Sequence, residues 1–180
     1  MSNICENFKQ IIVNNLEDIK NLKNKTIQKS DNSFVSEGDL LVQKIIAEEI
    51  KKNHNNYFLI SEENDHQEKW KDFDDFIVLD PIDGTDNFIS GMKEWGVGIS
   101  VFKKRKHTES MIFLPDMNIT LKSGEKVFKN RSRIIGMSSR YFKKGIDPCD
   151  NNYEYRALGC SMINMYYVCL LYTSPSPRDP

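Results

Sequence analysis

The pattern of apolar and polar positions predicts two amphipathic helices in the first third of the chain. Within residues 4–22 the apolar side chains recur at every third or fourth position, which is typical of a helix that buries one face. A polar segment, 24–35, follows. A second helix with a broad apolar face is predicted to begin near Ser36 and to end at Asn53. Ser36 and Asp39 have the spacing of a helix N-terminal capping pair, which supports that start.

Short strand patterns dominate the middle of the chain. Two wholly apolar runs predict buried strands, and a third run, which alternates apolar and polar residues, predicts a half-buried strand. These three runs, one further strand and three weaker candidates are 57–60, 76–79, 95–102, 109–114, 119–121, 127–128 and 133–137. Residues 160–168 look helical. Two helices followed by a strand-rich middle predict a layered α/β fold rather than a helical bundle or a barrel.

Two charged segments are predicted to be exposed connections. The acidic stretch 64–75 is expected to be a loop or a solvated helical turn. The basic run Lys103–Lys106 resembles a nuclear-localisation signal, but its place between two predicted strands favours a solvated hairpin loop.

Composition and charge narrow the function classes. The 180 residues contain 25 Lys and Arg against 26 Asp and Glu, so the formal charge is −1, and bulk binding to nucleic acid or an anionic membrane is not expected. No apolar run approaches the ~20 residues that span a bilayer. Residues 1–6 lack the basic and apolar regions of a signal peptide. We therefore expect a cytoplasmic protein with neither a membrane nor a nucleic-acid polymer as partner.

The cysteines and histidines do not form a metal-binding pattern. The four cysteines are widely spaced without a C-x-x-C pair, and the three histidines lie in polar stretches without H-x-x-x-H spacing. Reduced thiols and surface imidazoles are the interpretation that these spacings favour. The chemistry of the chain is therefore expected to rest on carboxylates.

A short segment after the second buried strand brings several oxygen ligands together. The apolar run 76–79 is expected to place Asp80 at the carboxyl end of its strand, and Pro81 is expected to stop the strand ladder there. The turn that follows would point the carboxylates of Asp80 and Asp83 and the carbonyl of Ile82 at one place. Such hard oxygen ligands suit Mg²⁺. For this segment alone, the alternative is a Pro/Asp/Gly turn with solvated acids.

Neighbouring residues add a candidate phosphate site and further acids. Gly84 completes the turn and Thr85 can begin a helix, so their amides would lie at a positive helix end that suits a phosphate. Glu62 and Glu63 follow the first buried strand, where catalytic groups of α/β sheets are expected, although solvated acids also occur there. Asp39 lies in the first turn of the second helix, and its capping role can coexist with a catalytic one.

In their order along the chain, these motifs resemble the inositol monophosphatase family, which belongs to the magnesium-dependent, lithium-sensitive phosphatases. The residues that carry the resemblance are Asp39, Glu62-Glu63, the segment from Asp80 to Thr85, and Gly159-Cys160-Ser161. It extends from the first helix to about Val168. The resemblance implies a layered αβαβα sandwich of the inositol monophosphatase and fructose-1,6-bisphosphatase type, incomplete at the C-terminus and a homodimer when full length.

The resemblance also implies a role for each motif residue. The Mg²⁺ ligands would be Glu62, Asp80, Asp83 and the Ile82 carbonyl, with Asp80 and Asp83 contributing to a second ion. The residues that orient or deprotonate the attacking water would be Asp39, Glu63 and Thr85. The substrate would contact the amides of Gly84 and Thr85 through its phosphate, and Gly159, Cys160 and Ser161 through its alcohol portion.

These roles imply a phosphoric monoester hydrolase. Water activated by two metal ions would hydrolyse a small phosphorylated substrate, an inositol or sugar monophosphate, without a covalent phosphoenzyme. Two alternatives remain open: a phosphatase of 3′-phosphoadenosine-5′-phosphate, and a non-catalytic protein that binds a metal or a phosphate. Ser61, Asp86 and Cys160-Ser161 depart from the residues usual in the family, which leaves the substrate preference open.

The end of the chain departs further from the family pattern. The family supplies another metal-binding aspartate in a Trp-Asp motif after the last predicted helix, whereas Trp70 and Trp95 lie upstream and neither precedes an aspartate. Within 169–180, the first eleven residues match one reading frame of a common transposase sequencing adapter. A proline-rich partner-binding tail is the alternative. We therefore expect 1–168 to be the N-terminal portion of a single phosphatase domain and 169–180 not to be native. Without the missing C-terminal elements, we expect this chain to fold marginally and to be inactive.

Overall fold

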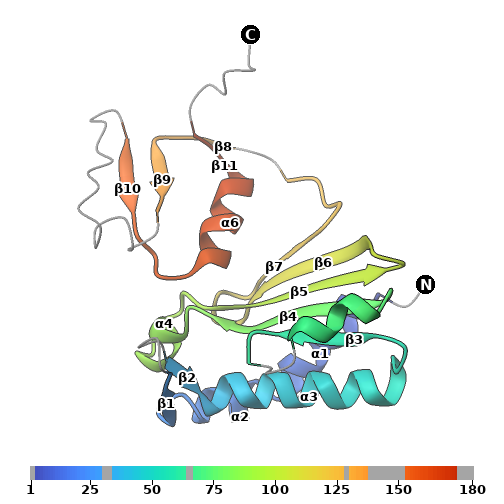
Figure 1. Ribbon diagram of the computed structural model, residues 1–180. Helices are drawn as coiled ribbons and strands as arrows, with labels where there is room; N and C mark the ends of the chain where they lie inside the picture. The colour runs from blue at the N-terminus through green and yellow to red at the C-terminus, as the bar shows by residue number, and fades with distance from the viewer. Residues whose placement is uncertain (1–2, 30–33, 64–66, 128–129, 138–152, 174–180) are drawn as a thin grey trace.

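A five-stranded mixed sheet forms the centre of the structure. The computed structural model describes residues 3–29, 34–63, 67–127, 130–137 and 153–173 (Figure 1). The strands lie in the order β3 (Phe58–Ser61), β4 (Phe76–Asp83), β5 (Gly96–Lys103), β6 (Lys106–Leu114) and β7 (Ile119–Lys122). β3 is parallel to β4, and the other neighbours are antiparallel. Each strand overlaps a run for which the hydrophobic pattern predicts one.

Three helices cover one face of this sheet (Figure 1). They are α1 (Ile4–Asn14), α2 (Leu16–Asn21) and α3 (Glu37–Asn53). Phe8, Ile12 and Ile46 have no exposed surface, and they share one apolar core with Ile77 of β4 and Ile99 of β5. The helical periodicity of the first third of the chain therefore identifies the faces that pack on the sheet.

The structure divides the predicted helix 4–22 in two at Asn15. The Asn15 amide donates to the Ile12 carbonyl (3.1 Å), and its side chain donates to the Ile11 carbonyl (2.8 Å). These bonds satisfy carbonyls that the end of α1 leaves without helical partners. The apolar periodicity continues across the break, which is why the sequence predicts a single helix.

The polar segment 24–35 holds an antiparallel pair of strands that the sequence does not predict. β1 (Thr26–Gln28) pairs with β2 (Phe34–Ser36), with Thr26 opposite Ser36. All three residues of β1 are exposed. An exposed strand needs no alternation of apolar residues, so the usual strand pattern is missing here.

β4 does not stop at Pro81, and the expectation that it would is wrong. Asp80 pairs with Gly98, and the ladder resumes where Asp83 pairs with Gly96, with a bulge between the two pairs. Pro81 has no amide hydrogen to donate, but a bulge leaves residues unpaired, so the proline is accommodated inside the strand. The short helix α4 (Thr85–Ile89) follows directly, as the sequence predicts.

The two charged segments take the predicted conformations where the structure describes them; residues 64–66 of the acidic stretch lie outside the described residues. The acidic stretch contains a short 3₁₀ helix, η1 (Gln67–Asp72). The basic run forms the turn between β5 and β6, where Lys104 and Arg105 have φ values of 49° and 59°. Two consecutive left-handed residues are typical of a two-residue hairpin. A second 3₁₀ helix, η2 (Pro115–Met117), connects β6 to β7.

The helix and strands described after β7 lie on the opposite side of the sheet from α1 and α3 (Figure 1). α6 (Ser161–Leu170) confirms the helix predicted at 160–168, and it contacts β5 and β6. Met162 and Ile163 form a second, smaller core with Leu114 and Cys160. Each helix in the described part of the chain is too short or too polar to pass through a lipid bilayer.

Four short strands accompany α6 in two parallel pairs. β9 (Ile134–Gly136) pairs with β10 (Glu154–Arg156), and β8 (Asn130–Ser132) pairs with β11 (Leu171–Thr173). β9 confirms the candidate strand at 133–137. The candidate at 127–128 is not confirmed at Val127, which belongs to no strand, and residue 128 lies outside the described residues.

Candidate active site

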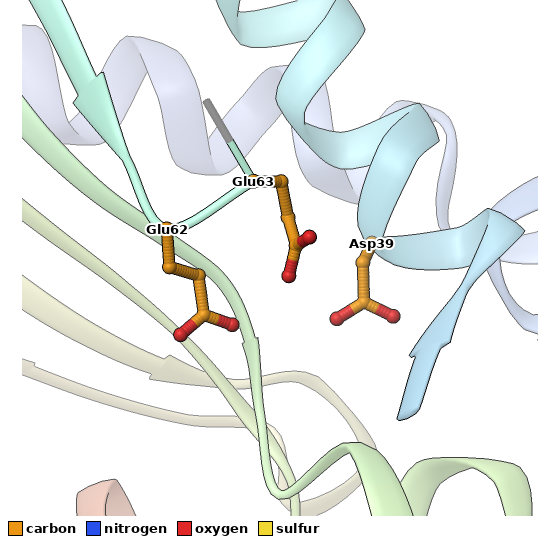
Figure 2. Close-up of side chains that lie close together, drawn as sticks. All are labelled: Asp39, Glu62 and Glu63. Carbon is orange, nitrogen blue, oxygen red and sulfur yellow. The ribbon is translucent and has the colours of Figure 1, made fainter. Parts of the chain in front are cut away.

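Acidic side chains gather at the edge of the sheet where β3 and β4 end. Glu62 and Glu63 follow β3 directly, and Asp39 lies in the first turn of α3. One carboxylate oxygen from each of the three lies within 4.8 Å of the others, and Figure 2 shows the carboxylates pointing into the same space. Because β3 and β4 are parallel, their carboxyl ends meet at this edge, where Asp80 and Asp83 of β4 also lie.

Asp39 is buried and caps α3. Ser36 Oγ accepts a hydrogen bond from the Asp39 amide (3.2 Å), while Asp39 Oδ2 accepts from the Ser36 amide (2.8 Å) and hydroxyl (2.5 Å). The predicted capping pair is thus confirmed. Asp39 Oδ1 lies 3.4 Å from the Thr85 hydroxyl. Burial raises the pKa of Asp39 above its ordinary value despite the bonds from Ser36. Asp39 therefore caps a helix and faces Thr85 at the same time.

Ser36→Ala should lower the free energy of unfolding more than the loss of an ordinary helix cap does. The Ser36 hydroxyl is buried and bonds both the amide and the carboxylate of Asp39, so we expect a loss of about 2 kcal/mol. Asn3→Ala is the matched control, because Asn3 caps α1 through the Glu6 amide at an exposed site and its loss should cost about 1 kcal/mol. Urea denaturation compares the two variants. Equal losses would contradict a separate contribution from the contact between Ser36 and the Asp39 carboxylate.

Asp80 is the most strongly perturbed carboxyl group of this cluster. Burial and the negative charges of its acidic neighbours raise its pKa to about 7. Those neighbours, in decreasing order of effect, are Glu62, Asp83, Asp39 and Glu63. Among the residues that the structure describes, no group forms a hydrogen bond with the buried Asp80 Oδ1. Asp80 Oδ1 is therefore an oxygen without a hydrogen-bond partner in the described part of the chain, inside a negatively charged site.

The stability of the metal-free protein should fall as the pH rises through the pKa of Asp80. With a folded-state pKa of about 7 against an ordinary value of 3.8, Asp80 binds its proton more tightly in the folded chain than in the unfolded one. Below the unfolded pKa the ionisation penalty is absent, and it grows as the pH rises from about 4 to about 7. Denaturant unfolding in the presence of a chelator measures this decrease. If Asp80 instead stabilised the fold increasingly across this pH window, the raised pKa of its carboxyl group would be contradicted.

Lys29 brings a positive charge to the site that the sequence does not single out. Its ammonium group lies 2.6 Å from Glu63 Oε1, and the Glu63 side chain is only 6% exposed. Burial and the charge of Glu63 raise the pKa of Glu62. Lys29 directly follows β1, so the unpredicted strand pair places it here. The sequence does not mark Lys29 as a site residue, because it differs from the other lysines of the chain in no local pattern.

The segment from Asp80 to Thr85 forms the predicted turn. Gly84 has a φ of +83°, in the left-handed region that favours glycine, and it caps α4. A Cβ atom at Gly84 would also lie 2.9 Å from the Cβ atom of Cys160. Thr85 is the first residue of α4, and its hydroxyl lies 3.1 Å from the Ile82 carbonyl. Both backbone conformation and packing therefore require glycine at this turn.

A cleft of about 680 Å³ lies between the sheet and α6. Glu62, Asp80 and Asp83 line it, together with Ser161 and Met162 from the first turn of α6. Residues from three separate parts of the sequence thus meet around one concave space that is large enough for a small molecule.

The segment before α6 adjoins this cleft. Gly159 has a φ of +70°, and Cys160 is buried with its sulfur 3.1 Å from Asp83 Oδ2. Ser161 is exposed and lines the cleft. The structure therefore brings the predicted Gly159-Cys160-Ser161 motif to the acidic site, with Ser161 on the open side and the Cys160 thiol turned toward Asp83.

The donor set of the site fits a hard divalent cation. Glu62, Asp80 and Asp83 offer carboxylate oxygens to the cleft, and one of these, Asp80 Oδ1, lacks a hydrogen-bond partner in the described part of the chain. Carboxylate and carbonyl oxygens are the ligands that Mg²⁺ prefers. A cation here would also offset the mutual repulsion that raises the pKa of Asp80.

The sequence matches a family model and is similar to several curated proteins. A model of the inositol monophosphatase family matches residues 2–156. The Nus factor SuhB of Xylella fastidiosa is 26% identical over 145 residues, which covers 74% of this chain and 50% of that protein. The 3′(2′),5′-bisphosphate nucleotidase CysQ of Haemophilus influenzae is 34% identical over 94 residues, 51% of this chain and 35% of that protein. The chain thus spans half or less of the length of these curated relatives.

Solved structures share the fold. A staphylococcal inositol monophosphatase in an LiCl-soaked inhibitory complex matches with a TM-score of 0.71 at 18% identity, over 92% of this chain and 68% of that chain. An IMPase/NADP phosphatase in complex with Mg²⁺ and phosphate matches with a TM-score of 0.66 at 16% identity, over 91% of this chain and 71% of that chain. These likenesses confirm the α/β fold predicted from the sequence.

Proposed function

Since the chain belongs to the inositol monophosphatase family, we propose that it derives from a Mg²⁺-dependent phosphoric monoester hydrolase. The observation that carries this proposal is the buried Asp80 Oδ1, which no described residue hydrogen-bonds, within a group of acids at the carboxyl ends of β3 and β4. A phosphate dianion would be repelled by such a group unless cations neutralised it. Bound Mg²⁺ would supply that neutralisation and polarise the phosphoryl oxygens. Glu62, Asp80, Asp83 and the Ile82 carbonyl are the proposed ligands.

The proposed role of Thr85 is to orient the attacking water. Its hydroxyl lies within reach of both the Ile82 carbonyl and Asp39 Oδ1, and it can donate its hydrogen to either of them. The hydroxyl oxygen can then accept a hydrogen bond from water. The raised pKa of Asp39 makes that carboxylate a better proton acceptor than an exposed aspartate. Glu63 would share this task, and its ion pair with Lys29 (2.6 Å) would hold its carboxylate in place.

The proposed substrate contacts extend from α4 to α6. The amides of Gly84 and Thr85 would bind phosphate oxygens at the start of α4. Gly159, Cys160 and Ser161 would border the alcohol portion, since this segment adjoins the acids and Ser161 lines the cleft. The substrate class that we propose is an inositol or sugar monophosphate.

A second candidate substrate is 3′-phosphoadenosine-5′-phosphate. The likeness to the 3′(2′),5′-bisphosphate nucleotidase CysQ, at 34% identity over 94 residues, favours it. The site chemistry is the same for both candidates, because either substrate presents a phosphate monoester to the acids. A non-catalytic protein that binds Mg²⁺ or phosphate is the alternative from another functional class.

A phosphate-release assay tests the proposed function. The panel contains inositol 1-phosphate, glucose 1-phosphate and 3′-phosphoadenosine-5′-phosphate, each with Mg²⁺ alone and with added Li⁺. Two proteins are compared: the 180-residue chain, and the product of the same gene read beyond codon 168 from an independent DNA preparation. We expect Mg²⁺-dependent, Li⁺-sensitive release from the second protein and none from the first. Turnover by the 180-residue chain would contradict its proposed inactivity, and no turnover by either protein would contradict the proposed function.

The same DNA preparation tests the proposed domain boundary. We propose that residues 1–168 are the N-terminal portion of one phosphatase domain and that 169–180 are not native, because the match to an adapter translation begins at Cys169. The expected gene diverges from this sequence at codon 169 and encodes a further acidic ligand downstream. A gene that retains the 169–180 sequence would contradict this boundary.

A further inference from the structure

One oxygen of Asp83 is bound by the segment that begins α6. Asp83 Oδ2 accepts a hydrogen bond from the Met162 amide (2.5 Å) and lies 3.1 Å from Cys160 Sγ. Met162 is the second residue of α6, so an acid from the end of β4 satisfies an amide that the first helical turn leaves unpaired. Asp83 also lines the cleft beside Asp80 and Glu62. It therefore connects the acidic site to α6.

Close packing fixes the first turn of α6 against the sheet. A Cβ atom at Gly84 would lie 2.9 Å from the Cβ atom of Cys160, and a Cβ atom at Gly98 would lie 2.3 Å from Met162 Cε. Both separations are shorter than carbon atoms tolerate, so the two side chains occupy space that exists only because the facing residues are glycines. Cys160 and Met162 thus reach Asp83 from a rigidly defined direction.

Asn87 fixes the segment that precedes Cys160. Its side-chain amide is within 2.7 Å of both the Glu94 and the Leu158 carbonyls, and the residue is 8% exposed. Gly159 lies so close that a Cβ atom there would be 2.8 Å from Asn87 Oδ1. The backbone on the N-terminal side of Cys160 is therefore tied to α4, which starts two residues after Asp83.

We propose that Cys160 is a positioning residue, which together with the Met162 amide holds Asp83 Oδ2 so that Asp83 Oδ1 is presented to the cation in the cleft. The inference rests on the proposed function, because it assigns a cation to the site. The Cys160 thiol donates to Asp83 Oδ2 at 3.1 Å, beside the bond from the Met162 amide to the same oxygen. The affinity for the cation and the placement of the first turn of α6 are then coupled.

Isothermal titration calorimetry with Mg²⁺ measures the effect of Cys160 on the cation site. Cys160→Ala removes the donor and should weaken Mg²⁺ binding about threefold to tenfold. Cys160→Ser keeps a donor at the same position and should bind Mg²⁺ within about twofold of the unmodified chain. Cys5→Ala is the matched control, since Cys5 is also buried and has its pKa raised beside a carboxylate, that of Glu109, but it belongs to α1, on the opposite side of the sheet from α6 (Figure 1). It should leave Mg²⁺ binding unchanged.

Infrared spectroscopy of the metal-free protein tests the contact itself. The difference between the spectra of the unmodified chain and Cys160→Ala isolates the S–H stretching band of Cys160, which a hydrogen bond to a carboxylate shifts to lower frequency. Asp83→Asn should move this band to higher frequency, because an amide oxygen is a weaker acceptor than a carboxylate. A band that does not respond to Asp83→Asn would overturn the proposal without any use of Mg²⁺.

The two measurements separate this inference from the proposed function. If the unmodified chain binds Mg²⁺ and Cys160→Ala binds it equally well, the positioning role is wrong and the proposed metal site stands. If the S–H band responds as expected but the unmodified chain does not bind Mg²⁺, the contact stands, whereas the cation site and the role assigned to Cys160 in it are both wrong. Weaker binding by Cys160→Ala with recovery in Cys160→Ser supports the proposal.

Discussion

Asp80→Asn should make the metal-free protein more stable and remove its affinity for Mg²⁺. In the unmodified chain a buried carboxyl group with a pKa of about 7 must ionise among four other acids at neutral pH. Replacing it with a neutral amide of the same size removes that penalty, which is on the order of 2–4 kcal/mol at pH 7. The same change removes the proposed central ligand, and we expect Mg²⁺ affinity to fall more than about 100-fold.

Thermal and chemical unfolding with and without Mg²⁺ test both parts of this prediction. Mg²⁺ should raise the unfolding midpoint of the unmodified chain and leave that of Asp80→Asn unchanged. Asp86→Asn is the matched control, because Asp86 is an exposed acid in the first turn of α4, and it should show neither effect. If Asp80→Asn is less stable than the unmodified chain without metal, repulsion from the neighbouring acids does not make the Asp80 carboxylate destabilising.

Thr85→Val should lower phosphate release by the longer gene product about 10²- to 10⁴-fold, which is the usual contribution of a group that moves or orients a proton. Valine has nearly the shape of threonine but no hydroxyl, so the contacts with the Ile82 carbonyl and Asp39 are lost. Because the Thr85 side chain is not a proposed ligand of Mg²⁺, the Mg²⁺ affinity should stay within about twofold.

Thr85→Ser provides the control for this prediction. It keeps the hydroxyl and removes one methyl group, so its rate should lie within about tenfold of the unmodified protein. A kcat that falls equally in Thr85→Val and Thr85→Ser would indicate that packing at the start of α4 matters rather than the hydroxyl. A kcat that does not fall in Thr85→Val would exclude the proposed role in orienting water.

Local sequence signals predicted the parts of the site whose residues are close together along the chain. Ser36 and Asp39 are three residues apart, and their reciprocal bonds follow from helix-start chemistry alone. Gly84 takes the left-handed conformation that the turn requires. The position of Glu62 and Glu63 at the end of an apolar run was also sufficient to place them at the sheet edge, although the apolar residues of β3 are half-buried rather than buried.

Contacts between distant segments could not be predicted in the same way. The Met162 amide and Asp83 are 79 positions apart, and Lys29 and Glu63 are 34 apart. Neither pair leaves a local pattern in the sequence. In the first pair one partner is a backbone amide, which every residue but proline has, and in the second pair one partner is one of many lysines. The bulge at Pro81 is a similar case: the sequence shows that the residue cannot donate, but not that the opposing strand leaves it unpaired.

Calorimetric titration of the metal-free 180-residue chain with Mg²⁺ tests the central claim most directly. The claim is that Glu62, Asp80 and Asp83 at the ends of β3 and β4 form a cation site for phosphate-ester chemistry. We predict a saturable heat of binding that releases protons near pH 7, because Asp80 with its pKa of about 7 must ionise to bind the ion. We also predict that this heat is absent in Asp80→Asn and retained in Asp86→Asn. No saturable heat in the folded, unmodified chain, or an equal heat in Asp80→Asn, would contradict the claim.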